Sequence, residues 1–322
     1  MIFVTGGTGL VGSHILLKLS EKGIQCKALK RKDSDMKVCQ SVFTHYKKDH
    51  LFKKIIWTEG DVNDIPSLET SMESCEKMIH AAAIVSFHPK DQDMMYKINV
   101  IGTRNIMNVA INSNIQKVCY ISSIAALGSD NDDHVDENSI FKMENQSNYA
   151  ISKYLSEQEV WRASAEGLDT VIVNPSLILG PGDRNKGSSQ IFQKIYKGLK
   201  FYTIGKTGFV DVIDVADCAI KMLESRIINE RFIVSAENIN YRKIFNMIAE
   251  NFNKPKPTIK VTPLLKEISW RIEMFRHLFT SNNPIITKES VESSMKIRSY
   301  SNEKIKAELG HKFIPIKESI EN

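Results

Sequence analysis

Apolar and polar positions follow two different rhythms along the first half of the chain. Short apolar runs fit buried strands, and the longer stretches between them carry apolar residues at helical spacing. The alternation is typical of βαβ units, so we expect an α/β fold: a doubly wound parallel sheet with helices on both faces. The predicted strands span 2–5, 25–29, 55–59, 77–81, 117–121 and 170–173, and the predicted helices include 10–22, which Gly23 ends, and 94–112.

The rhythm weakens after about Pro175, where several glycines interrupt the chain. One more strand is predicted at 231–235, followed by helices that include 241–253 and 302–309. We therefore expect a smaller C-terminal lobe after the parallel sheet.

A further helix is predicted at 264–279, where apolar residues such as Ile268 and Ile272 recur at helical spacing. Packing within the lobe is the default interpretation. Trp270 and Met274 lie in the same stretch. A lid over an apolar substrate and a contact with a membrane surface therefore stay open as alternatives.

The composition is that of an ordinary soluble protein, with 42% hydrophobic and 25% charged residues among 322. No apolar run reaches the roughly 18 residues that span a bilayer, so no stable membrane insertion is expected. The first strand begins at Ile2, which leaves no room for an export signal, and the five cysteines are scattered without CxxC spacing. We expect a cytoplasmic protein with reduced thiols.

Charge and histidine spacing argue against two classes of partner. The 43 basic and 38 acidic residues are spread along the chain, so no nucleic-acid partner is expected. The histidines show no HxH or HExxH spacing, and we expect no metal. An acidic stretch fits a solvated loop that could border a substrate; it holds Asp130, Asp132, Asp133, Asp136 and Glu137.

Candidate chemistry begins directly after the first strand, in the sequence VTGGTGLVG at 4–12. Gly7, Gly9 and Gly12 satisfy GxGxxG, whereas Gly6, Gly9 and Gly12 satisfy TGxxGxxG. A strand, a glycine turn and a helix together are the context of a dinucleotide fingerprint, in which the helix N-terminus binds the pyrophosphate. We predict a Rossmann dinucleotide site formed by Gly6, Thr8, Gly9, Leu10, Val11 and Gly12.

The end of the second predicted strand indicates which dinucleotide is preferred. An acid there binds the ribose hydroxyls of NAD, whereas a basic residue accommodates the 2′-phosphate of NADP. The chain has Lys30, Arg31 and Lys32 at this place, and the first acid is Asp33. We expect Arg31 to pair with the phosphate, so NADP is preferred and NAD is the alternative.

Adding Tyr149 and Lys153, in the sequence YAISK, makes the chain resemble the extended short-chain dehydrogenases/reductases of the broad NAD-dependent epimerase/dehydratase group. The resemblance covers nearly the whole chain and is carried by the order and spacing of many segments. These are GDV at 60–62, HAAA at 80–83, NVIGTRN at 99–105, YISS at 120–123, NPS at 174–176, GPG at 180–182, FVDV at 209–212, DVA at 214–216 and AELG at 307–310.

For the cofactor, the resemblance implies that Asp61, next to Val62, reads the adenine. It also implies that Pro175 and Ser176 border the nicotinamide. The strand end beside the cofactor would be formed by Ala81, Ala82 and Ala83. These expectations give a dinucleotide-binding domain at 1–174 and a mainly substrate-binding lobe at 175–322. Part of the chain, about 209–236, would return to the first domain.

For catalysis, the resemblance implies that Tyr149 donates or accepts the proton and that Ser123, with Ser122 as its rival, bonds the substrate oxygen. Asn99 would support Lys153 through backbone and water groups. A free tyrosine has a pKa near 10, so it needs a cation to act at neutral pH. Lys153 lies four residues later on the same helical face, where we expect it to lower the Tyr149 pKa and hold the nicotinamide ribose.

The favoured activity is the reduction of a ketone or aldehyde, or oxidation of the matching alcohol, as in the dihydroflavonol-reductase-like and hydroxysteroid-dehydrogenase-like branches. A nucleotide-sugar epimerase or dehydratase is the first alternative. It is disfavoured because GKTGFVD at 205–211 lacks the arginine expected there, and only Lys206 could replace it. A non-catalytic dinucleotide-binding regulatory protein is the second alternative. The resemblance also implies a homodimer as a candidate assembly.

Overall fold

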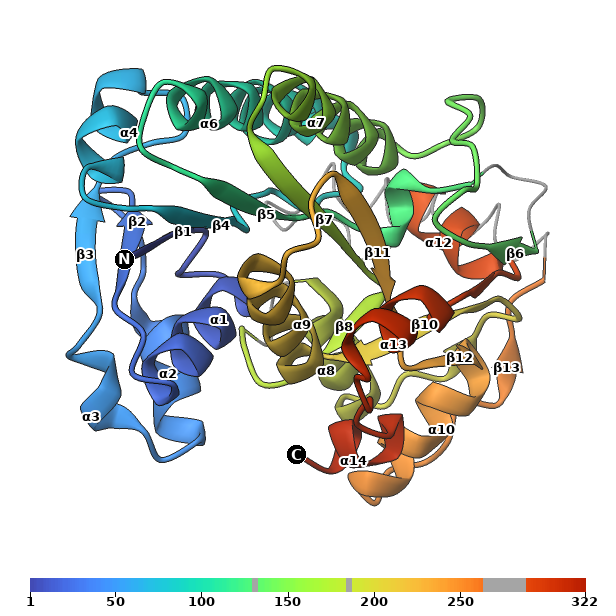
Figure 1. Ribbon diagram of the computed structural model, residues 1–322. Helices are drawn as coiled ribbons and strands as arrows, with labels where there is room; N and C mark the ends of the chain where they lie inside the picture. Colours follow the sequence, from blue (N-terminus) through green and yellow to red (C-terminus); the bar gives the residue numbers. More distant parts are fainter. Residues whose placement is uncertain (129–132, 184–186, 263–287) are drawn as a thin grey trace.

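The computed structural model describes residues 1–128, 133–183, 187–262 and 288–322. Seven parallel strands form the main sheet in the order β11-β7-β5-β4-β1-β2-β3 (Figure 1). The predicted α/β fold is confirmed, and each strand begins within one residue of its predicted start. The strands are β1 (Ile2–Thr5), β2 (Cys26–Lys30), β3 (Ile56–Glu59), β4 (Lys77–His80), β5 (Lys117–Ile121), β7 (Asp169–Pro175) and β11 (Glu230–Val234).

Helices cover both faces of this sheet (Figure 1). On one side lie α4 (Ile65–Met72), α6 (Gly102–Ile111) and α7 (Asn148–Ala165), and on the other lie α1 (Leu10–Glu21), α2 (Lys37–His45), α3 (Asp49–Phe52) and α9 (Val212–Glu224). Successive side chains of a strand point to opposite faces. Accordingly, Ile2 and Val4 of β1 join the core beneath α1 and α9, while Phe3 joins the core beneath α6 and α7.

The helix predicted at 94–112 differs from the structure in its first half. After a 3₁₀ turn η1 (Pro89–Asp91), the helix begins as α5 (Gln92–Met95), continues as a π-helical turn η2 (Tyr96–Ile101) and then becomes α6. Within the π turn, the Asn99 carbonyl accepts hydrogen bonds from the hydroxyls of Thr103 and Ser156. Apolar spacing could not predict this interruption, because the Ser156 hydroxyl comes from α7.

The second lobe is built around a three-stranded sheet in the order β12-β10-β8. Its strands are β8 (Leu177–Leu179), β10 (Lys206–Asp211) and β12 (Glu237–Asn240), and its core also includes α8 (Gln190–Tyr196), α10 (Tyr241–Asn251) and α14 (Ile316–Glu321). The remaining elements are η3 (Ile124–Ala126), β6 (His134–Val135), η4 (Gly187–Ser189), β9 (Phe201–Tyr202), β13 (Ile259–Lys260), α12 (Lys288–Met295), β14 (Ser299–Tyr300) and α13 (Glu303–Leu309). The helix predicted at 264–279 lies outside the described residues.

The chain passes between the two sheets after β10. Strand β10 belongs to the small sheet, whereas α9 packs on the main sheet and β11 pairs with β7. We retain as a proposal the division into 1–174 and 175–322, with the return at about 209–236.

Strand β11 forms one edge of the main sheet, and side chains cover its outer polar groups. The Ile233 amide donates to the Glu137 carboxylate at 2.8 Å. The Arg231 carbonyl accepts from the Lys304 ammonium at 3.0 Å, and the Arg231 guanidinium donates to the Glu137 carbonyl at 2.8 Å. These contacts satisfy backbone groups that an edge strand otherwise leaves unpaired.

Candidate active site

The turn after β1 is shaped by close backbone contacts. Gly6 has a φ of +71°, which glycine adopts without strain, and the Gly9 amide donates to its carbonyl at 2.9 Å. A Cβ on Gly6 would lie 2.6 Å from the Ala81 carbonyl carbon, and one on Gly12 would lie 2.1 Å from the Gly6 oxygen. The atoms nearest to a Cβ on Gly7 belong to side chains. The backbone therefore demands glycine at positions 6 and 12, the first and last glycines of TGxxGxxG.

Helix α1 begins at the end of this turn with its amino end at the carboxyl edge of the sheet. Its N-cap residue, Gly9, makes no side-chain capping bond, so the amides of the first turn are available to a ligand. The turn also lies between β1 and β4, where the strand order reverses. This is the place where doubly wound folds bind a dinucleotide, and partly exposed Thr8, Leu10 and Val11 border it. The residues fit a pyrophosphate.

A buried chain of hydrogen bonds through His80 lies beside the turn. The imidazole bonds the Thr5 hydroxyl at 2.6 Å through Nδ1 and the Thr103 hydroxyl at 3.0 Å through Nε2. Because Thr103 gives its own proton to the Asn99 carbonyl, it can only accept from Nε2–H. Burial lowers the pKa of His80 to about 3, so the ring is neutral and Nδ1 accepts from Thr5. The chain connects the glycine turn to Asn99.

The residues expected at the adenosine end follow the neighbouring strands β2 and β3. Asp61 accepts two hydrogen bonds through Oδ1 from Asn63, at 2.8 Å from the amide and 3.0 Å from Nδ2. The Val62 side chain is buried and packs on Gly102, so it faces the core. The Arg31 side chain is 58% exposed, with Nε 3.9 Å from the Asp33 carboxylate.

The residues at the ends of β4 and β7 differ in which groups they can offer to a cofactor. The amides of Ala81 and Ala82 donate to the carbonyl and hydroxyl oxygens of Thr5, at 3.3 and 3.2 Å, while Ala83 is exposed. Pro175 and Ser176 are both buried at the end of β7. The Ser176 hydroxyl lies toward Gly208. Any contact that Ser176 makes with a cofactor would therefore use its backbone.

Ser123 and Tyr149 are brought together at the carboxyl end of β5. Ser123 lies two residues after the end of the strand and caps η3, where its hydroxyl accepts from the Ala125 amide at 3.1 Å. The same hydroxyl hydrogen-bonds the Tyr149 phenol, which lies in the first turn of α7. The Phe87 ring packs edge-on against Tyr149, with centroids 5.9 Å apart. Of the two candidate serines, Ser123 is the one beside the tyrosine.

Lys153 lies one helical turn after Tyr149 and is only 1% exposed. Its ammonium donates to the Tyr120 hydroxyl at 2.6 Å and to the Ile121 carbonyl at 2.9 Å. It also lies 4.4 Å from the centroid of the Tyr120 ring. Burial lowers the pKa of Lys153 to about 7, while the nearby Glu157 carboxylate raises it. The lysine is therefore anchored to β5.

The expected shift of the Tyr149 pKa is wrong in direction. Burial raises that pKa, and the hydrogen bond from Ser123 lowers it only in part. The Lys153 ammonium is directed to Tyr120 and Ile121 instead. Spacing along a helix places two side chains on one face, but it does not say which partner each one bonds.

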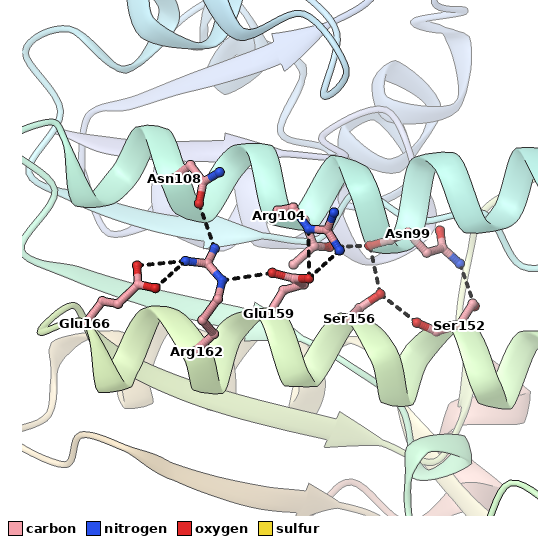
Figure 2. Close-up of polar contacts among 9 residues, drawn as sticks. Asn99, Arg104, Asn108, Ser152, Ser156, Glu159, Arg162 and Glu166 are labelled. Atoms are coloured by element: carbon pink, nitrogen blue, oxygen red, sulfur yellow. Dashed lines mark hydrogen bonds and ion pairs between the residues drawn. The ribbon is translucent and has the colours of Figure 1, made fainter.

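Asn99 connects the π turn to α7, the helix that carries Tyr149 and Lys153 (Figure 2). Its amide group bonds both backbone groups of Ile84, at 2.8 Å to the nitrogen and 2.9 Å to the oxygen, and donates to the Ser152 hydroxyl at 3.0 Å. The Ser156 hydroxyl donates to the Asn99 carbonyl at 2.7 Å. Asn99 thus fixes α7 on both sides of Lys153, as well as the chain after β4.

Sequence reasoning missed several buried or half-buried residues around this set. Glu157 lies four residues after Lys153, a spacing that could have shown it on the same face. Tyr120 stands in the YISS segment, but nothing in the motif indicates that it bonds the lysine. Arg231 is 74 residues from Glu157 in sequence, and only the fold brings the two together.

The described residues contain no group of three or more histidine, cysteine, aspartate or glutamate side chains suited to a metal ion. Within the same part of the chain, no helix has both the length and the apolar character needed to cross a bilayer.

A glycine turn at the strand-order reversal, facing a tyrosine-lysine helix, defines a Rossmann-fold enzyme that uses a nicotinamide dinucleotide. The family model described as "NAD dependent epimerase/dehydratase family" matches residues 2–234, and the chain belongs to this family.

The similar proteins include reductases and sugar-nucleotide enzymes. A Synechocystis sp. protein whose name likens it to dihydroflavonol 4-reductase is 31% identical, over 99% of this chain and 92% of its own. Cinnamoyl-CoA reductase 1 of Petunia hybrida is 27% identical, over 99% and 90%.

Among solved structures, gox2253 has a TM-score of 0.81 at 29% identity, covering 100% of this chain and 96% of its own. The Thermotoga maritima UDP-glucose 4-epimerase has a TM-score of 0.76 at 19% identity, over 99% and 96%, and shares the fold.

Proposed function

We propose that this protein is an NAD(P)-dependent oxidoreductase that reduces a ketone or aldehyde, or oxidises the matching alcohol. The observation that carries the proposal is the contact between Ser123 and Tyr149 at the end of β5, with Lys153 one helical turn behind. Named reductases among the relatives, one of them 31% identical, support the same reaction class.

The bound reduced nicotinamide would supply the hydride to the carbonyl carbon. Tyr149 would give its phenolic proton to the carbonyl oxygen, so that the product is an alcohol. The raised pKa of Tyr149 favours this direction, because the phenol keeps its proton at neutral pH. Ser123 would donate a hydrogen bond to the same oxygen and orient it as negative charge develops.

The decisive experiment replaces Tyr149→Phe, which removes only the phenolic oxygen. Loss of a general acid is worth about 100- to 10,000-fold in turnover, so we expect NADPH consumption against an accepted carbonyl substrate to fall by that factor. Tyr154→Phe is the matched control, because Tyr154 lies on the same helix and stacks on Phe141 with centroids 4.4 Å apart. Unchanged turnover in Tyr149→Phe would contradict the proposed role of Tyr149 and with it the proposed reaction.

The same assay separates the other activities. Interconversion of UDP- or GDP-sugars without net NADPH loss would indicate an epimerase. Stoichiometric NADPH binding without turnover of any carbonyl or sugar substrate would instead indicate a regulatory protein.

For the cofactor, we propose NADP in preference to NAD. The exposed Arg31 guanidinium at the end of β2 supports this choice, since its ion pair with Asp33, at 3.9 Å, is long and solvent-exposed and leaves donors for a charge-assisted pair with a 2′-phosphate. Such a pair contributes about 1.5–3 kcal/mol, so Arg31→Ala should weaken NADPH binding about 10- to 100-fold and barely affect NADH. Lys22→Ala, an exposed lysine at the far end of α1, is the control. Equal losses for the two dinucleotides would contradict this assignment.

A further inference from the structure

Glu157 is a carboxylate inside the protein, 0% exposed and one helical turn after Lys153. One oxygen accepts from the Asn174 amide at 2.6 Å, and the other lies 3.4 Å from the Arg231 guanidinium. Burial raises the pKa of Glu157, which means that the fold opposes its charge. A carboxylate at such a position weakens the fold unless its partners compensate for the lost hydration. The nearby Ser122 hydroxyl, Arg231 and Asn174 act as those partners, because each lowers the pKa that burial raises.

Lys153 is also buried, and its positive charge has likewise lost hydration. Both hydrogen bonds of its ammonium go to neutral oxygens, those of Tyr120 and Ile121. Neutral acceptors replace part of the lost hydration but leave the positive charge without a counter-charge. Glu157 is on the same face of α7 and supplies the opposite charge.

The elements packed around Lys153 bring few other charged or titratable groups near it. Strand β4 presents His80, which is neutral at pH 7 because its pKa is about 3. Strand β5 presents the Tyr120 phenol, and α7 itself presents the Tyr149 phenol. From β11, the Arg231 guanidinium lies 3.4 Å from the Glu157 carboxylate.

Arg231 is held in turn by the loop after β6. Its guanidinium donates to the Glu137 carbonyl at 2.8 Å, while the Glu137 carboxylate bonds the Ile233 amide. Arg231 therefore pairs with Glu157, which lies one helical turn after Lys153 on the same face of α7.

We propose that Glu157 is a positioning residue that keeps Lys153 in its ammonium form, and that Asn174 and Arg231 keep Glu157 ionised for this purpose. The inference rests on the proposed function, because the charge of Lys153 matters for activity only if Lys153 takes part in the proposed reaction. Glu157 would touch neither substrate nor cofactor. It would act through the charge of Lys153.

The direct test measures the protonation of Lys153 without turnover. Lysine labelled with ¹³C at Cε is titrated by NMR in the full-length protein, and the Lys153 resonance is identified by its loss in Lys153→Met. A nearby opposite charge shifts a pKa by about 1–3 units, so Glu157→Gln should lower the Lys153 pKa by at least about 1 unit. An unchanged Lys153 pKa overturns the inference.

Glu159→Gln is the matched control for removing one carboxylate from α7. Glu159 is directed at Arg104 and Arg162, along α7 from the Ser152 and Ser156 contacts (Figure 2). It should leave the Lys153 titration where it is. An equal shift in Glu159→Gln would mean that the total charge of α7, and not Glu157 in particular, sets the Lys153 pKa. That result also overturns the inference.

A second variant covers the case in which Glu157→Gln fails to fold because Arg231 is left unpaired. Glu157→Gln combined with Arg231→Leu removes both charges. It should still lower the Lys153 pKa, since Glu157 is the neighbour one turn away. Glu157→Asp keeps the charge and should restore most of the wild-type value.

The pH profile of kcat/KM distinguishes this inference from the proposed function. If both hold, the alkaline limb of Glu157→Gln moves to lower pH by at least about 1 unit, because the ammonium is lost earlier. Merely structural damage would lower the whole profile without moving the limb. If the NMR titration moves but the limb does not, the Glu157 pairing stands and the catalytic role of Lys153 fails.

Discussion

Helix α7 carries charged residues in two settings that differ in almost every respect. Lys153 and Glu157 are buried against the sheet, whereas Glu159, Arg162 and Glu166 form a partly exposed row that Arg104 of α6 joins (Figure 2). The side chains of that row are 13% to 48% exposed. Similar residue types on one helix therefore have different consequences, set by access to water.

The two settings respond to different variables. Exposed ion pairs are screened by salt and each stabilises a protein by roughly 0–1 kcal/mol. Buried charges are screened little, and they shift pKa values. The buried residues should thus control activity and its pH dependence, while the exposed row should control only a small, salt-dependent part of stability.

The largest expected contrast is in activity. If Lys153 serves the proposed reaction through its positive charge, Lys153→Met should reduce kcat/KM about 100-fold or more, because methionine carries no ammonium. Arg162→Met breaks the bonds to Glu159 and Glu166 but should leave kcat/KM within about 3-fold of wild type. Steady-state kinetics on an accepted carbonyl substrate measures both. Comparable losses in the two variants would end the distinction between the settings.

A second contrast concerns the pH dependence of folding. His80 has a folded pKa of about 3 against an ordinary value of 6.5, so the unfolded chain binds more protons between those limits. The contribution of neutral His80 to the free energy of unfolding is fully present above pH 6.5. It is lost as pH falls, by about 1.4 kcal/mol per pH unit within that window. His80→Gln should flatten the fall in unfolding free energy between pH 6 and about pH 4, as measured by urea titration.

His50→Gln is the control for that titration, because His50 is exposed. It should keep the wild-type slope. A His80→Gln slope equal to wild type would show that the buried imidazole does not resist protonation in the folded state.

The smallest expected effect is on the exposed side. A double-mutant cycle on Arg104 and Glu159, whose charged atoms are 2.8 Å apart, should give a coupling of about 0.2–1 kcal/mol. Half a molar of salt should reduce that coupling. A coupling of several kcal/mol, insensitive to salt, would place this pair with the buried charges.

Much of the fold could be predicted from the sequence because the strands of the main sheet are covered on both faces. A strand buried in this way reads as a short apolar run, and 117–121 was located to the residue. The π turn could not be predicted, because it depends on the Ser156 hydroxyl of a distant helix reaching Asn99.

The candidate site was predictable to the extent that it follows local spacing. Gly6 and Gly12 follow from their interval, but only the structure shows that a side chain at either would meet backbone atoms, whereas one at Gly7 would meet the buried Leu16 side chain at 2.8 Å. The Tyr149 pKa depends on burial outweighing a hydrogen bond, and no sequence interval reports that balance. Arg231 joins the site because β11 pairs with β7, a result of sheet topology.

The covered edge of β11 has a consequence for how copies of this chain can associate. A strand added from outside would have to displace the Glu137 carboxylate from the Ile233 amide and the Lys304 ammonium from the Arg231 carbonyl. We expect the sheet to end at β11, without continuous cross-subunit or fibrillar growth from this edge. Glu137→Ala would uncover one backbone donor there, and light scattering during prolonged incubation would report any added tendency to aggregate.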